Sequence, residues 1–192
     1  VYDVTVQVSD GFLSDTQAIA VTMTPVNDNT PVITSNGGGA TAAISLAENT
    51  LPVTTVTASD ADLPTSTLTY TIIGGADSAR FSLNSSTGQL SFLAAPNYEV
   101  PSDAGASNVY DVTVQVSDGT YTDTQAIAVT ITADNDNTPA ITSNGGGAAA
   151  SVSIVEHTTA VTTVTATDAD LPAQTLTYSI AGGNDAGQFT VD

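Results

Sequence analysis

Apolar and polar side chains alternate with a period of two along three segments of the chain. The segments cover 67–72, 110–116 and 127–131, and their apolar members include Tyr70, Val114 and Val129. This spacing predicts β-strands with one buried side and one side in solvent. Shorter strands are expected near 32–35, 42–46, 53–58, 80–84 and 88–93, between turns of Gly, Pro, Asn and Ser. About seven short strands in about 100 residues, without a helical period, predict an all-β fold built as an antiparallel sandwich.

The same pattern returns farther along the chain. VYDVTVQVSDG begins at Val1 and again at Val109, NDNTP begins at Asn27 and Asn135, and TVTASDADLP at Thr55 has a near copy at Thr163. A separation of about 108 residues is the size of a whole domain and not of a solenoid unit. We therefore expect the last strands of one repeat over 1–26, a complete repeat over 30–133, and the early part of a third repeat over 138–192.

The repeat boundaries do not coincide with the ends of the chain. We expect the sequence to be a window on a longer continuous polypeptide. A second possibility stays open, in which 1–26 and 138–192 of separate subunits complement each other head to tail through exposed strand edges.

The charge of the chain narrows the choice of partners. It holds 20 Asp and Glu against one Lys or Arg, which is Arg80, and its formal net charge is −19. Phosphate contacts need Lys and Arg, so this balance argues against nucleic acids and anionic membrane surfaces and favours cations. Cys and Lys are absent and His occurs once, which removes disulfides, thiolate and Schiff-base chemistry and a histidine metal cluster. We predict a protein that is not an enzyme.

The acidic residues gather at the ends of predicted strands and in the linkers between repeats. They include Glu48, Asp60, Asp62, Glu99, Asp118, Asp134 and Asp136. Oxygen ligands without nitrogen or sulfur are typical of a site for a hard cation, Ca²⁺ before Mg²⁺. The simpler interpretation is that Asp, Asn and Gly form good turns.

Taken in order, these motifs resemble the cadherin repeat in its bacterial form. The matching pieces are Leu46-Ala47-Glu48-Asn49, Asp60-Ala61-Asp62, Asn97-Tyr98-Glu99, the strand 110–118 and Asn135-Asp136-Asn137-Thr138-Pro139. The resemblance covers the whole chain. It implies tandem seven-stranded Greek-key β-sandwich domains of the cadherin or immunoglobulin-like kind, joined by linkers that bind about three Ca²⁺ at each joint.

The resemblance also implies a ligand set at each joint. The first joint precedes the complete repeat and would use Asn27, Asp28, Asn29, Asp60, Asp62 and Asp118. The second joint follows it and would use Glu48, Asn97, Glu99, Asn135, Asp136, Asn137, Asp168 and Asp170. Asn97 stands where the family usually has Asp, so the outermost ion of the second joint is expected to bind more weakly.

These expectations together predict an extracellular, Ca²⁺-dependent structural or adhesive rod at a cell surface. It would be a stalk segment of a bacterial adhesin or surface filament, with Ca²⁺, the neighbouring repeats and further copies of itself as partners. The alternative is a cadherin-like carbohydrate-binding module of a polysaccharide-degrading protein, for which Tyr121 is the candidate exposed aromatic residue.

Overall fold

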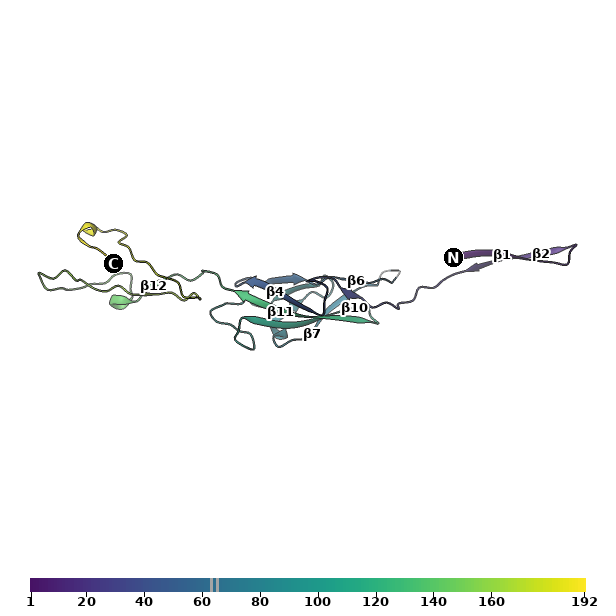
Figure 1. The fold of residues 1–192 in the computed structure, drawn as a ribbon, viewed down its shortest axis with the longest axis horizontal. Helices are drawn as coiled ribbons and strands as arrows, with labels where there is room; N and C mark the ends of the chain where they lie inside the picture. The colour runs from purple at the N-terminus through teal and green to yellow at the C-terminus, as the bar shows by residue number, and fades with distance from the viewer. Residues whose placement is uncertain (63, 65) are drawn as a thin grey trace.

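The computed structural model describes residues 1–62, 64 and 66–192, and no α-helix occurs among them. Figure 1 shows three parts in a row, with a hairpin at the N-terminal end, a compact sandwich in the middle and the C-terminal residues beyond it. Helical structure in the described residues is limited to the 3₁₀ turns η1 (Ser78–Arg80), η2 (Ser143–Gly145) and η3 (Ala186–Gln188). None of them is long and apolar enough to cross a membrane.

The central repeat is a β-sandwich, which confirms the predicted all-β fold. One sheet has the order β4-β11-β10-β7, and a second has the order β5-β9-β8. The bounds of the first sheet are β4 (Thr41–Ala47), β7 (Thr69–Gly74), β10 (Val109–Ser117) and β11 (Thr122–Thr132). Those of the second are β5 (Pro52–Thr55), β8 (Phe81–Leu83) and β9 (Gln89–Phe92), and β3 (Val32–Ile33) pairs with β6 (Ala58–Ser59).

The core lies between these sheets and follows the period of two in the sequence. Along β10 the side chains of Val112, Val114 and Val116 are at most 1% exposed, while their neighbours face outward or are half-buried. From the other sheet, Phe92 stacks on Phe81 with ring centroids 4.6 Å apart. It also meets the edge of Tyr110 at 5.1 Å. These contacts join the two sheets into one hydrophobic core.

Two features of the sandwich differ from the sequence-based expectation. The antiparallel arrangement is wrong for β4, which pairs with β11 in parallel, Thr41 opposite Ala126 and Ala47 opposite Thr132. A parallel pair needs a long connection, and here most of the repeat separates the two strands. The single strand expected over 53–58 is also wrong, because β5 and β6 belong to different sheets. Val56, which is fully buried between them, donates its N–H to Gly88 O at 2.8 Å, where the chain crosses over.

The two outer parts hold the same motifs with few strand partners. The hairpin of β1 (Tyr2–Ser9) and β2 (Ser14–Val21) pairs Tyr2 with Val21, the same register that pairs Tyr110 with Val129. All of its residues are exposed. In 138–192 the strands are β12 (Ala140–Ile141) and β13 (Ala166–Thr167), which pair with each other in the antiparallel direction.

Candidate metal centre

Three carboxylates of the complete repeat meet at the first joint. Asp60 and Asp62 follow β6, and Asp118 follows β10, so one end of the sandwich carries all three. One oxygen of each lies within 4.8 Å of the others. Asp60 Oδ1 accepts the N–H of Asp62 at 2.8 Å, whereas its buried Oδ2 has no hydrogen-bond partner among the described residues.

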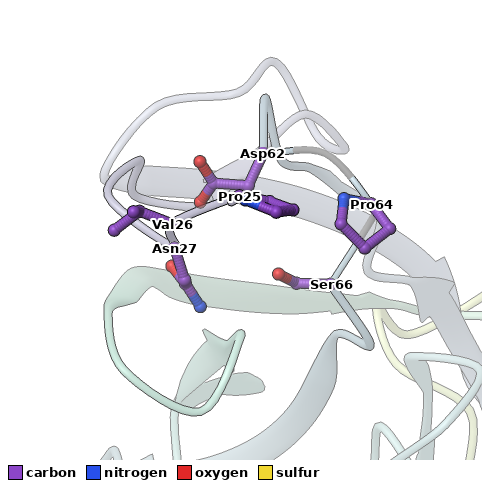
Figure 2. A pocket seen from close by; sticks show the side chains of 6 residues that line it. All are labelled: Pro25, Val26, Asn27, Asp62, Pro64 and Ser66. Carbon is purple, nitrogen blue, oxygen red and sulfur yellow. The ribbon is translucent and has the colours of Figure 1, made fainter. Parts of the chain in front are cut away.

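The linker before the complete repeat donates hydrogen bonds to this cluster. Asn29 donates its backbone N–H to Asp62 Oδ2 at 3.1 Å and its side-chain amide to Asp62 Oδ1. The amide also reaches Asp28 Oδ1 at 3.1 Å. The side-chain amide of Asn27, with its NH₂ turned toward the carboxylates, donates to Asp62 Oδ2 and Asp118 Oδ2 at 3.0 Å each. Figure 2 shows Asn27 and Asp62 beside a hollow that Pro25 and Pro64 border.

Hydrogen bonds favour the charged form of two carboxylates at the first joint, Asp62 and Asp118. The Asn29 side-chain amide is the main cause that lowers the pKa of Asp62, against desolvation, which raises it. Desolvation also acts on Asp118, but the backbone N–H groups of Tyr121 and Thr120 outweigh it and lower the pKa of that carboxyl. The site therefore stays anionic at neutral pH.

A second cluster lies at the opposite end of the complete repeat, at the second joint. Glu48 follows β4, Glu99 follows β9 and Asp136 belongs to the linker, and one oxygen of each lies within 4.8 Å of the others. Glu48 is only 3% exposed and accepts the N–H of Tyr98 at 2.7 Å and of Asp134 at 2.8 Å. These two bonds aim a buried carboxylate at the linker.

Glu99 reaches across to the third repeat. Its Oε1 accepts the N–H of Leu171 at 3.1 Å, while its Oε2 is buried without a hydrogen-bond partner among the described residues. Asp170, which is 1% exposed, accepts the N–H of Asn137 at 3.0 Å and its side-chain amide at 2.8 Å. Asp168 in turn accepts the N–H of Asp170 at 3.0 Å. These are the contacts that Asn29, Asp60 and Asp62 make at the first joint.

The side-chain oxygen of Asn97 is used locally. It accepts the N–H of Val100 at 2.8 Å in a turn, and the side chain is exposed. Two residues outside the predicted ligand sets contact the second joint. Asn49 donates its amide to Asp136 Oδ2, and Gln174 accepts the amide of Asn135 at 2.9 Å. Asn49 directly follows the predicted ligand Glu48, so its position near the second joint could have been expected from the sequence. The sequence contained no such indication for Gln174.

The donor set of both joints fits a hard cation. Every candidate ligand is a carboxylate, carboxamide or backbone oxygen, the ligand chemistry of Ca²⁺. Two like charges 4.8 Å apart repel by about 1–3.5 kcal/mol at effective dielectric constants of 80–20. The buried oxygens of Asp60 and Glu99 that lack a hydrogen bond point to a positive partner, because such groups are rarely left unsatisfied.

Comparison with known proteins finds relatives of this chain. Residues 42–133 match the cadherin domain. Human protocadherin Fat 1 is 32% identical over 185 residues, which is 94% of this chain and 4% of that protein. Human protocadherin Fat 4 is 31% identical over 200 residues, 100% of this chain and 4% of that protein.

A solved structure of the extracellular cadherin domains 3–6 of protocadherin gamma B2 is similar as well. It aligns with a TM-score of 0.58 and 26% identity over 88% of this chain and 42% of that one. The chain spans a small fraction of its curated relatives. Its fold is that of cadherin repeats, and its central repeat matches the cadherin domain.

Proposed function

We propose that this chain is a segment of an extracellular rod whose joints are stiffened by Ca²⁺. One observation carries the proposal: carboxylates from a repeat and from the linker that follows it converge within 4.8 Å, in Glu48, Glu99 and Asp136. Cadherin domains are extracellular adhesion modules that generally bind Ca²⁺, which supports the choice of ion. The rod would be the stalk of a bacterial adhesin or surface filament.

In this proposal, each joint is held by carboxylates of two successive repeats and by the linker between them. At the second joint the ligands would be Glu48, Asn97, Glu99, Asn135, Asp136, Asn137, Asp168 and Asp170, and at the first Asn27, Asp28, Asn29, Asp60, Asp62 and Asp118. Ca²⁺ supplies the positive charge that joins them. Without it the carboxylates repel, so the joints bend; with it the repeats are locked in line.

The rod would act by holding a binding partner at a distance and would associate with further copies of itself. Extracellular modules bind Ca²⁺ at about 10⁻⁴–10⁻³ M, so extracellular fluids would fill the joints and the cytosol would not.

Small-angle scattering tests the proposal directly. With Ca²⁺ the scattering should fit one extended particle with a large maximum dimension. With a chelator it should fit a broad distribution of bent shapes. Identical scattering profiles with Ca²⁺ and with chelator would contradict the rod. A glycan array separates the rod from the carbohydrate-binding module, since tight binding to one polysaccharide would favour the module.

A further inference from the structure

One of the differences between the two joints lies just beyond the aspartate pair of each repeat. Both hold an aspartate pair, in which Asp62 and Asp170 accept the N–H of the last linker asparagine at 3.1 and 3.0 Å. Beyond that pair the first joint has Ser66, and the second has Gln174 at the matching place in the repeat.

Gln174 forms a bridge between the second linker and the third repeat. Its Oε1 accepts the side-chain amide of Asn135 at 2.9 Å, and its Nε2 donates to Asp170 Oδ2 at 3.4 Å. Asp170 in turn holds the linker through the N–H groups of Asp136 at 3.4 Å and of Asn137 at 3.0 Å. The linker is therefore attached to the third repeat by hydrogen bonds that need no cation.

The first joint has a hollow of about 340 Å³ where this bridge would be. Figure 2 shows Ser66, Asn27 and Asp62 around it, between the rings of Pro25 and Pro64. Serine lacks the second methylene and the carboxamide of glutamine. At the first joint Asn27 instead donates its own side-chain amide to Asp62 Oδ2 and Asp118 Oδ2, at 3.0 Å each, without contact through a glutamine.

We propose that Gln174 is a positioning residue that orders the second linker on the third repeat before a cation binds. An ordered linker loses less conformational freedom on binding, so the second joint binds its cation more tightly than it would with the serine of the first joint. The affinity part rests on the proposed function, whereas the ordering of the linker does not.

Amide hydrogen exchange of the full chain, measured over the linkers 27–29 and 135–137, tests the proposal. The two variants give each joint the residue that the other joint has at this position. In chelator, Gln174→Ser should speed exchange over 135–137 by about two- to twelvefold, the factor expected for the loss of one typical hydrogen bond. Ser66→Gln should slow exchange over 27–29 by a similar factor. Gln89→Ser, on the exposed side of β9 and away from both joints, is the control and should change neither segment.

A Ca²⁺ titration of the same variants gives the second measurement. Gln174→Ser should raise the Ca²⁺ concentration that half-protects 135–137 by about two- to twelvefold. If Gln174→Ser matches Gln89→Ser in chelator, the proposal is overturned, even where Ca²⁺ protects both linkers. If Ca²⁺ protects neither linker but the difference in chelator persists, the rod fails and the ordering role of Gln174 stands.

Discussion

Replacing Glu48 by glutamine separates the structural role of this carboxylate from a role in binding a cation. Glu48 is 3% exposed, and its two oxygens accept the N–H groups of Asp134 and Tyr98 at 2.8 and 2.7 Å. Glutamine keeps one acceptor and turns its own NH₂ toward the other donor. The loss of one hydrogen bond to a charged group costs about 1.5–3 kcal/mol of folding free energy.

The same substitution removes the repulsion between Glu48 and the neighbouring carboxylates. Without metal this gain in stability opposes the cost of the lost hydrogen bond. Oxygens of Glu99 and Asp136 lie within 4.8 Å of an oxygen of Glu48, so two repulsive pairs disappear. At about 1–3.5 kcal/mol per pair this relief amounts to about 2–7 kcal/mol. In chelator the relief therefore offsets the lost hydrogen bond. With Ca²⁺ bound the repulsion is already neutralised, and the lost bond and lost ligand both remain as costs.

Thermal unfolding in chelator and in about 10 mM Ca²⁺, above the range expected for extracellular modules, measures this difference. A loss of 1 kcal/mol lowers Tm by about 4–8 °C in a domain of this size, so Glu48→Gln should lower Tm by about 10 °C or more in Ca²⁺. In chelator Tm should fall by no more than a few degrees.

Asp103→Asn is the matched control for this experiment. Asp103 is 7% exposed, belongs to neither carboxylate cluster and accepts N–H groups of Gly105, Ser107 and Asn108. Its substitution should destabilise the protein equally with and without Ca²⁺. If Glu48→Gln shifts Tm by the same amount in both conditions, Glu48 is not a cation ligand and the reasoning is refuted.

Three further results are expected. In a calorimetric Ca²⁺ titration, Glu99→Ala should lose more affinity at the second joint than Asp134→Ala, because an oxygen of Glu99 is buried and unpaired while Asp134 is exposed; equal losses would contradict the assigned linker ligands. Val114→Ala, at a fully buried position, should cost about 2 kcal/mol in denaturant unfolding. Val6→Ala, at the equivalent position of the first hairpin and at a side chain 50% exposed, should cost less than about 0.5 kcal/mol. Equal costs for the two substitutions would contradict the burial of Val114 in the core. The pKa of Asp170 is lowered chiefly by the side-chain amide of Asn137 in the linker. The Asp170 carboxylate therefore stabilises the fold fully above the ordinary Asp pKa near 4, and this stabilisation is lost as pH falls through the lower pKa of the folded state. The protection factor of the second-linker amides in chelator, which corrects for the intrinsic pH dependence of exchange, should fall over that acid range, and Asp170→Asn should remove this fall.

The exposed side of the sandwich and the composition of its core could be predicted from the sequence. Val112, Val114 and Val116 alternate with polar residues, and this alternation alone assigns them to the buried side of β10. The reason is local, since successive side chains of any strand point to opposite faces. The repeated NDN and Asp-Ala-Asp motifs likewise predicted where oxygens would gather, because both follow strand ends.

The pairing of distant segments was decided by the tertiary structure alone. No local pattern states that β4 lies parallel to β11, or that the residues between β5 and β6 cross from one sheet to the other. The buried, unpaired oxygens of Asp60 and Glu99 also depend on contacts between segments far apart in the sequence. The role of Gln174 could not be predicted from the sequence either. Its difference from Ser66 is one of many between the repeats, and only the folded structure brings its amide to the linker and to Asp170. Strand periodicity acts within a few residues, whereas register, burial of a charge and a bridge across a joint depend on which chain segments meet.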